Sequence, residues 1–266
     1  MSIFLQALRT PARSVPLIPI AARALSVGPK DWHKYLKPGT IVYPPEDFQL
    51  GIGGAVIDLK RGNRPAIVLF SPEIKARYQK VFTVFLSDKD RSSRRIIHGV
   101  AVSKSEGAPR DSIAVTNQVA SVDLNLLRPL RSSGKMLTIS EETLTAVKEG
   151  VRGNFVPKRR RAKICQGSVV AIQLGDHTVE GVVLSNVDAL EPHRVAVMAD
   201  SEADIHCPFE HTVKVSMRHL RGHHEARTVF VYEITPVDAR RMQKVGQIIP
   251  EDFTAITAAL FKAMDI

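Results

Sequence analysis

The chain has 266 residues, of which 44% are hydrophobic, and its formal net charge is +10 at pH 7. This hydrophobic content argues against a disordered chain, and because no run of about 18 apolar residues occurs, no membrane-spanning segment is predicted. Only two cysteines are present, Cys165 and Cys207, which excludes a disulfide framework and is typical of a reducing compartment. The positive charge favours a polyanionic partner, nucleic acid first, with a solvated basic surface or organelle targeting as the alternative.

The first thirty residues are basic and contain no acid. Arg9, Arg13, Arg23 and Lys30 precede the first acid, Asp31. An acid-free, Arg-bearing and Ser-containing start is typical of a mitochondrial transit peptide. We therefore expect residues 1–30 to direct the protein to the mitochondrial matrix, with a disordered basic arm that binds RNA as the alternative.

Short β-rich apolar runs follow and predict strands in a first domain, residues 31–155. In chain order they are 40–43, 66–70, 81–86, 100–102 and 113–115. Ser140, followed by Glu141 and Glu142, predicts the start of a helix that runs to about residue 150, because a serine cap and early acids favour a helix N-terminus. The first half is thus expected to be a run of strands closed by a helix.

The second half, residues 166–266, has the same organisation. Its predicted strands are 168–172, 182–184, 195–198, 213–215 and 229–231. A helix is expected from about Pro250, where proline suits the first turn, with an apolar face that includes Phe253 and Ile256.

Residues 156–165 separate the two halves and form a basic linker. Its cations are Lys158, Arg159, Arg160, Arg161 and Lys163. Because charged segments extend and stay solvated, a linker alone explains this composition, and contact with a phosphate backbone is the other interpretation.

Histidines gather in the second half together with a cysteine. They are His206, His211, His219, His223 and His224, with Cys207 among them. No CxxC pair and no regular histidine spacing is present, so no metal and no cofactor is predicted. A polar loop or histidines that face RNA are the expected explanation.

Three short stretches of the first half recur in the same order in the second. Gly39-Thr40-Ile41-Val42 returns as Gly167-Ser168-Val169-Val170, Val119-Ala120-Ser121-Val122-Asp123 as Ile234-Thr235-Pro236-Val237-Asp238, and Ile139-Ser140-Glu141-Glu142 as Ile249-Pro250-Glu251-Asp252. The offsets shrink from 128 to 115 to 110 residues, which predicts a duplicated domain with different loop lengths.

Four motifs of the first half resemble those of the MazF/PemK family of toxin endoribonucleases. They are Pro38-Gly39-Thr40-Ile41-Val42, Gly62-Asn63-Arg64-Pro65-Ala66-Ile67-Val68-Leu69, Val81-Phe82-Thr83-Val84-Phe85-Leu86-Ser87 and Ile113-Ala114-Val115-Thr116-Asn117-Gln118-Val119-Ala120-Ser121-Val122-Asp123. The resemblance covers residues 38–150 and, more faintly, 166–264.

The resemblance implies an α+β, mainly β fold. It implies an SH3-like, CcdB/PemK-type barrel closed by a C-terminal helix, present here in two tandem copies. Since the family works as a homodimer, the two copies are expected to form an intramolecular pseudo-dimer instead.

The resemblance also implies a metal-independent mechanism in which the 2′-hydroxyl of RNA attacks the neighbouring phosphate. An arginine and a threonine serve this step. Arg64 matches the family's arginine, and Ser87 falls where the threonine stands. The family's acid falls on Leu59, with Asp58 adjacent but on the opposite face of a strand. The catalytic candidates are therefore Arg64, Ser87 and Asp58, and an ion pair between Arg64 and Asp58 is the structural alternative.

The second copy lacks these groups. Val179 stands at the arginine position and Gly181 near the alanine, and Ser201 is the only counterpart of Ser87. The second copy is thus expected to be catalytically empty.

These observations predict a non-catalytic mitochondrial RNA-binding protein, a component or assembly factor of the mitochondrial ribosome, with ribosomal RNA and ribonucleoprotein proteins as partners. Its RNA contacts are expected at the linker cations and at Arg64, Arg91, Arg94, Arg95, Arg218, Arg221 and Arg227. Two alternatives stay open. One is a MazF-type endoribonuclease that cleaves single-stranded mitochondrial RNA without metal, and the other is a protein–protein adaptor for an acidic partner.

Overall fold

The computed structural model describes residues 32–44, 64–88, 99–156, 164–174, 177–185, 193–200, 212–220 and 222–266. By its internal contacts the chain separates into Met1–Tyr35 and Leu36–Ile266. The described part of the first unit is a 3-10 helix, η1 (Trp32–Tyr35). The elements below belong to the second unit, which contains both halves of the sequence.

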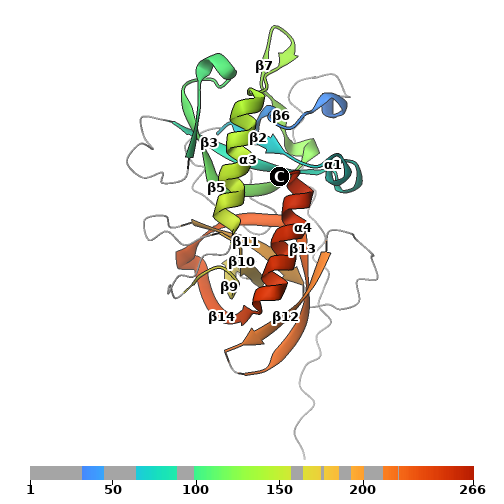
Figure 1. Ribbon diagram of the computed structural model, residues 1–266, viewed down its shortest axis with the longest axis vertical. Coiled ribbons are helices and arrows are strands. Elements are labelled where there is room, and N and C mark those ends of the chain that lie inside the picture. Colours follow the sequence, from blue (N-terminus) through green and yellow to red (C-terminus); the bar gives the residue numbers. More distant parts are fainter. Residues whose placement is uncertain are drawn as a thin grey trace, which may run out of the picture. The chain divides into compact units, whose positions relative to one another are not determined.

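The first half is built on a six-stranded antiparallel sheet (Figure 1). Its strands are β1 (Ile41–Tyr43), β2 (Ala66–Leu69), β3 (Lys80–Asp88), β4 (Gly99–Val102), β5 (Ser112–Asp123) and β6 (Arg128–Pro129). They lie in the order β4-β5-β3-β2-β1-β6. A two-stranded sheet, β7 (Arg131–Ser132) with β8 (Lys135–Met136), and two 3-10 turns, η2 (Lys104–Glu106) and η3 (Leu124–Leu126), complete the β part.

The strands predicted from apolar runs are present, because these runs supply the buried side chains of the sheet. Every residue of β2 is buried, and so are residues 81–86 of β3. β5 continues to Asp123, well beyond the predicted 113–115, since the motif that ends at Asp123 pairs with β3 over its whole length. The helix α1 (Pro72–Tyr78) was not predicted; Ser71 caps it by accepting from the Ile74 N–H at 3.3 Å.

The helix α3 (Glu141–Phe155) closes the first half. Ser140 is its N-cap, as predicted, and accepts from the Thr143 N–H at 3.2 Å. The helix extends five residues beyond the predicted end because its buried stripe continues through Val151 to Phe155. Gly150 permits this packing, since a Cβ atom there would lie 2.8 Å from Cγ2 of Thr116 on β5.

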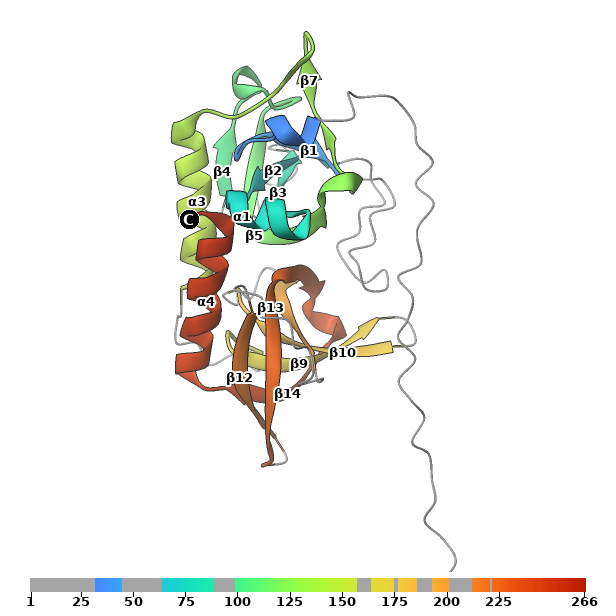
Figure 2. The same ribbon diagram turned by 90° about the vertical axis from the view of Figure 1, so that its right-hand side faces the viewer.

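The second half forms a closed barrel followed by a helix (Figure 2). The strands are β9 (Ser168–Leu174), β10 (His177–Val183), β11 (His193–Asp200), β12 (Thr212–His219), β13 (His224–Asp238) and β14 (Met242–Ile248). A 3-10 turn, η4 (Ala239–Arg241), precedes β14. The strand β14 was not predicted from the sequence. The helix α4 (Pro250–Met264) begins at Pro250 as expected.

The strand order of the first half recurs in the second. Read from β12, the barrel runs β12-β13-β11-β10-β9-β14, which matches β4-β5-β3-β2-β1-β6 strand for strand. Cross-strand partners and a register shift also recur: Ile41↔Ile67 corresponds to Val169↔Val182, Val84↔Val119 to Val197↔Ile234, and the shift after Val84 to the shift after Val197. The two halves differ at the pairing of β12 with β14, which closes the barrel.

The third repeat anchor of the sequence is out of register by one residue. Ser140 and Ile249 are both N-caps, so Ile139 corresponds to Ile248 and not to Ile249. The hydrogen bonds agree, because the Ile139 N–H donates to Gly39 at 3.1 Å and the Ile248 N–H donates to Gly167 at 3.0 Å. Acidic residues occupy the first turn of both helices, so an alignment of the two sequences that is shifted by one residue also pairs acid with acid.

The two halves contact one another through several elements. One buried apolar cluster includes residues of both sheets and of both long helices. The rings of Tyr78 and Tyr232 stack with centroids 4.2 Å apart, and Lys80 pairs with Glu233. The helices α3 and α4 lie side by side along part of their length in both ribbon views (Figures 1 and 2). Lys148 of α3 forms an ion pair with Asp265 at the end of α4, with Nζ 3.1 Å from Oδ2. No helix in the described part of the chain is long and apolar enough to cross a membrane.

Candidate nucleic-acid interface

Arg64 and Ser87 are opposite each other where the register of the β2–β3 ladder is continued by two residues. The register pairs Ala66 with Phe85, and the Leu86 N–H donates to the Pro65 carbonyl at 2.8 Å. The same register therefore puts Arg64 directly across from Ser87. Opposite residues of an antiparallel pair share one face of the sheet, with Cα atoms roughly 4.5–5.5 Å apart. The two residues proposed from sequence thus form one cross-strand pair.

The Arg64 guanidinium is half-buried. Burial lowers its pKa from the ordinary value, because removal from water disfavours the charged form. An arginine nevertheless stays charged in proteins, so the partial loss of hydration leaves a cation that attracts an anion more strongly. Among the described residues, none forms an ion pair with Arg64. This arrangement fits a phosphate contact.

The carboxylate nearest in sequence to Ser87 is engaged elsewhere. Asp88 follows Ser87 in β3, so its side chain points to the other face of the sheet. There its Oδ2 lies 2.9 Å from Nη1 of Arg110. Asp88 is therefore not placed to accept a proton beside Arg64. The candidate Asp58 lies outside the described residues.

Many of the predicted RNA contacts lie outside the described residues as well. They are Arg91, Arg94, Arg95, Lys158, Arg159, Arg160, Arg161, Lys163 and Arg221. The segment 89–98, which carries the first three, is joined to β3 two residues after Ser87. These three arginines are therefore close to Ser87 in the sequence.

The remaining two predicted contacts have different surroundings. Arg218 on β12 is exposed and free to meet a phosphate. Arg227 on β13 is held between two carboxylates, with Nη2 at 2.9 Å from Glu225 Oε2 and 3.2 Å from Glu180 Oε2. Two acids around one guanidinium leave it little attraction for a phosphate.

The equivalent place in the second half has lost both polar groups of the pair. Val182 corresponds to Ile67 through its partners on both sides, so Val179 occupies the position of Arg64, as the sequence predicted. The β10–β11 register places Asp200 across from Val179. Asp200, not Ser201, is therefore the counterpart of Ser87. This pair is not suited to phosphate, because a valine side chain has no hydrogen-bond donor and an ionised aspartate repels the anion.

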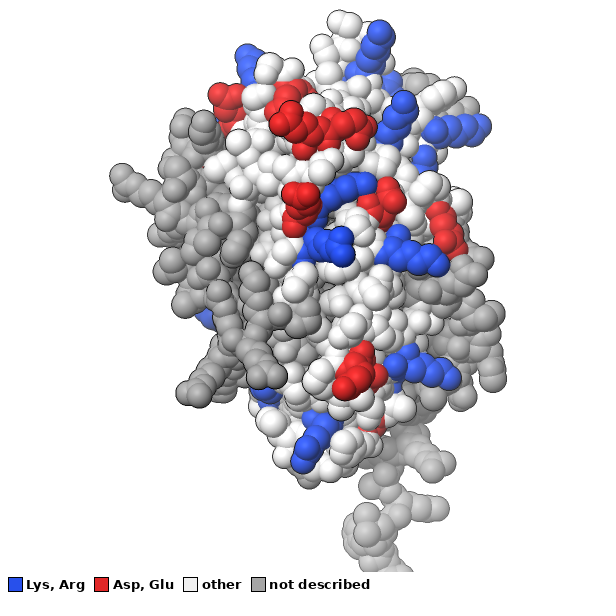
Figure 3. Space-filling model, in the orientation of Figure 1, with Lys and Arg blue, Asp and Glu red and all other residues white. Residues whose placement is uncertain are grey.

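Charges of both signs are mixed on the face shown in Figure 3. Lysine and arginine side chains alternate there with aspartate and glutamate, and the coloured residues of this face form no broad area of one sign. The described surface in this view therefore offers individual cations rather than a basic patch.

One group of candidate metal ligands was not predicted from the sequence. His219, His223 and Glu225 offer ligand atoms that all lie within 4.8 Å of one another. The sequence predicted no metal site, because it contains no CxxC pair and no regular histidine spacing. The sequence did contain a signal for this group. His223 and Glu225 are two residues apart, the spacing that puts two side chains on one face of a strand, and His219 is four residues before His223.

Comparison with known proteins finds a relation for the first half. The model of the family described as "PemK-like, MazF-like toxin of type II toxin-antitoxin system" matches residues 54–155. This match includes Arg64, Ser87 and α3. No curated protein matches the chain.

Three solved structures are similar to part of the chain. An endoribonuclease in complex with its cognate antitoxin from a mycobacterial species is 19% identical, covers 38% of this chain and 95% of its own, and has a TM-score of 0.32. MazE-MazF from Deinococcus radiodurans is 15% identical, with coverages of 36% and 90% and a TM-score of 0.30. A second mycobacterial endoribonuclease is 15% identical, with coverages of 40% and 97% and a TM-score of 0.31. By the family match, residues 54–155 are a PemK-like, MazF-like toxin domain, and the described fold is mainly β with few helices.

Proposed function

We propose that the protein binds single-stranded RNA through its first half, with Arg64 as a phosphate contact, and does not cleave it. The observation that carries this proposal is the Arg64–Ser87 pair. It is present in the half that matches an RNA-cleaving toxin family and replaced by Val179 and Asp200 in the other half. A half-buried arginine without a carboxylate partner in the described chain is suited to a phosphate.

Binding is favoured over cleavage because the described residues place no proton acceptor beside this pair. Attack by a 2′-hydroxyl needs a base within hydrogen-bond reach, and losing one such group reduces the rate by roughly 10²–10⁴. Asp88 points to the other face and contacts Arg110. Ser87 is a weaker proton acceptor than a carboxylate, although its hydroxyl is able to hydrogen-bond a phosphate oxygen.

We further propose that the second half is a divergent copy of the first, so that the chain is an intramolecular pseudo-dimer of two PemK-type barrels. The repeated strand order and registers support this duplication. The contacts between the halves support the dimer, because β5 and its equivalent β13 meet each other: Ser121 Oγ donates to the Ile234 carbonyl at 3.3 Å. Contact between equivalent surfaces is the property of a two-fold interface.

A mitochondrial matrix location and a role in the mitochondrial ribosome or its assembly are the final part of the proposal. They are supported by the acid-free, arginine-bearing composition of residues 1–30 and by the overall positive charge. Import of the radiolabelled chain into isolated mitochondria tests the location. Co-sedimentation of the tagged protein with ribosomal subunits, sensitive to ribonuclease, tests the assembly, and its absence would exclude the ribosomal role.

The decisive experiment compares Arg64→Ala with Arg110→Ala in the full chain. Both arginines belong to the first half, but Arg110 is 70% exposed and already contacts Asp88. Each protein is incubated with a fluorescent single-stranded RNA in EDTA, and binding and RNA integrity are both measured. We expect Arg64→Ala to bind several-fold more weakly, Arg110→Ala to bind nearly normally, and the RNA to stay intact. Equal binding by wild type and Arg64→Ala would overturn the assignment of Arg64.

A metal-independent endoribonuclease is the second candidate function. It is favoured by the same arginine, since a desolvated guanidinium opposite a hydroxyl is also suited to stabilise a phosphorane. The same incubation separates the two functions. Products with 2′,3′-cyclic phosphate ends, formed by wild type and lost in Arg64→Ala, would establish cleavage.

A further inference from the structure

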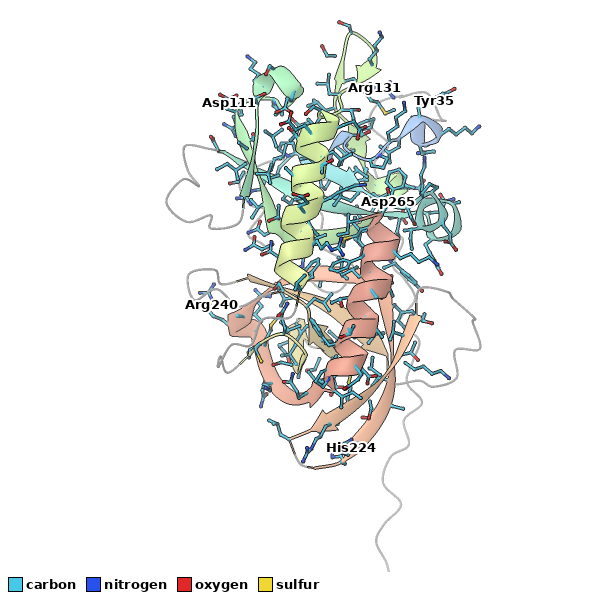
Figure 4. The ribbon with its side chains drawn as sticks, in the orientation of Figure 1. Tyr35, Asp111, Arg131, His224, Arg240 and Asp265 are labelled. Atoms are coloured by element: carbon cyan, nitrogen blue, oxygen red, sulfur yellow. The ribbon has the colours of Figure 1, made fainter. Side chains whose placement is uncertain are left out.

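The tip of the β12–β13 hairpin brings three ligand-type side chains onto one face. The register pairs Arg218 with His224, and the His219 N–H donates to the His223 carbonyl at 3.0 Å, so His219 and His223 are directly opposite. The left-handed conformation of Gly222, with φ 89°, belongs to the turn between them. Figure 4 labels His224 at this end of the hairpin.

Strand alternation adds Glu225 to the two histidines. His223 immediately precedes β13 and is two residues from Glu225 on that strand, and the ligand atoms of both lie within 4.8 Å of that of His219. The imidazole rings of His219 and His223 stack with centroids 4.3 Å apart. His219 Nε2 lies 3.3 Å from Glu225 Oε2, and the three ligand atoms are all within 4.8 Å of one another.

The His219 side chain gives an independent indication of a ligand. It is only 10% exposed, and its Nε2 is buried without a hydrogen-bond partner. Buried polar atoms normally form a hydrogen bond, and this nitrogen forms none although Glu225 Oε2 is 3.3 Å away, so its position needs an explanation. A bound cation supplies one, because it accepts the lone pair that no donor in the described part of the chain engages.

We propose that His219, His223 and Glu225 bind a divalent transition metal ion, zinc in the first place. Zinc takes imidazole nitrogen at about 2.0–2.1 Å and carboxylate oxygen at about 2.0–2.2 Å, so two tetrahedral ligands lie roughly 3.3–3.5 Å apart. The His219–Glu225 separation already has this value. His223 is exposed and able to complete the set by a small ring movement. Three protein ligands leave a fourth position for water.

Arg227 and Glu180 form the surroundings of this site. Arg227 bridges the two carboxylates, with Nη2 at 2.9 Å from Glu225 Oε2 and 3.2 Å from Glu180 Oε2. Within this group the two carboxylates outweigh the one guanidinium, which favours a cation. Arg227 is then a positioning residue that orients the Glu225 ligand, as outer-shell groups do at metal sites.

The test uses the full chain, stripped with EDTA, dialysed and titrated with zinc chloride by calorimetry. His224 provides a matched control, because it is the neighbour of His223, is also exposed, and points to the opposite face of the strand. We expect one zinc ion per chain for wild type and for His224→Ala, and an affinity at least about 10-fold weaker for His223→Ala. Zinc is also expected to raise the Tm of wild type and of His224→Ala but not that of His223→Ala, since a ligand bound to the folded state stabilises it.

Cobalt(II) substitution provides the geometric readout. A tetrahedral site with nitrogen and oxygen ligands gives intense visible absorption, which we expect for wild type and His224→Ala and not for His223→Ala. Absence of stoichiometric zinc binding by wild type would overturn the proposal. So would equal loss of binding in the two histidine variants, which would mark unspecific histidine binding. Circular dichroism of the metal-free variants confirms that both remain folded.

Discussion

Gly39 and Gly167 occupy the same place in the two halves of the molecule. Both have positive φ angles, 85° and 76°. The Gly39 N–H donates to Val68 at 2.8 Å, and the Gly167 N–H donates to Val183 at 2.9 Å. Each glycine thus turns the chain into the first strand of its half and ties it to the second. A side chain at either position is disfavoured, because L-residues rarely adopt this conformation.

Gly167→Ala is expected to lower the free energy of unfolding by about 1–2 kcal/mol, since the left-handed conformation is unfavourable for alanine. Its Cβ would also lie 2.8 Å from Gln247 Nε2, which must move. Gly153→Ala in α3 is the control, because a Cβ there meets nothing within 4 Å. It is expected to stabilise by about 0.5–1 kcal/mol. Urea unfolding measures both, and equal effects of the two variants would contradict the structural role of Gly167.

The two halves are expected to unfold in one cooperative transition, because the main buried cluster contains residues of both. Leu260→Ala in α4 removes a fully buried side chain and should destabilise by about 2–5 kcal/mol. Lys262→Ala, an exposed change on the same helix, should stay within about 0.5 kcal/mol. Differential scanning calorimetry is the measurement. Two separate transitions, with only the second shifted by Leu260→Ala, would show that the halves unfold independently.

The ion pair between Lys80 and Glu233 connects the two halves at partly exposed positions. We expect a double-mutant cycle with Lys80→Ala and Glu233→Ala to give a coupling energy of up to about 1 kcal/mol, reduced at high salt. A parallel cycle on Arg110 and Asp88 tests a pair within the first half, in which the arginine is 70% exposed. A coupling of zero for Lys80 and Glu233 at low salt would show that this pair does not stabilise the contact between the halves.

Glu106 is expected to titrate at unusually low pH. The Thr143 hydroxyl, and then those of Ser140 and Ser103 with the Ser103 N–H, donate to its carboxylate and lower its pKa from 4.5 to about 2. A lowered pKa in the folded state stabilises the fold above pH 4.5, and this contribution is lost as the pH falls from 4.5 toward 2.

Removing the largest cause tests this assignment. Thr143→Ala is expected to raise the pKa of Glu106 toward its ordinary value, whereas Thr145→Ala, which removes a hydroxyl bonded to the Glu141 carbonyl, should leave it unchanged. NMR titration of the side-chain carboxyl carbon measures both. A midpoint near 4.5 in the wild type would rule out the hydrogen-bonded carboxylate.

Arg64→Ala is expected to reduce the dependence of RNA affinity on salt by about one unit in the slope of log K against log[salt], because one phosphate contact is lost. Arg64→Lys keeps the charge but not the planar fork, so it should preserve the slope while weakening binding. Fluorescence anisotropy over a range of salt concentrations gives both values. An unchanged slope in Arg64→Ala would indicate that Arg64 does not contact phosphate.

The sequence alone predicted those features that depend on residues close together in the chain. Apolar runs identified most strands, because a buried strand must be filled with side chains such as those of Ala66–Leu69. Ser140 and Pro250 marked the starts of the two long helices, since caps and first-turn prolines act within one turn. The motif that contains Arg64 indicated the relation to the toxin family, which the match over residues 54–155 supports.

Only the tertiary structure decided which residues meet. The pairing of Arg64 with Ser87, the identity of Asp200 as the counterpart of Ser87, and the one-residue shift at Ile249 all depend on strand register or helix position. Register is set by cross-strand hydrogen bonds between segments far apart in the chain, which composition and spacing do not specify. The same holds for His219 and Glu225, since a hairpin turn and strand alternation bring them together.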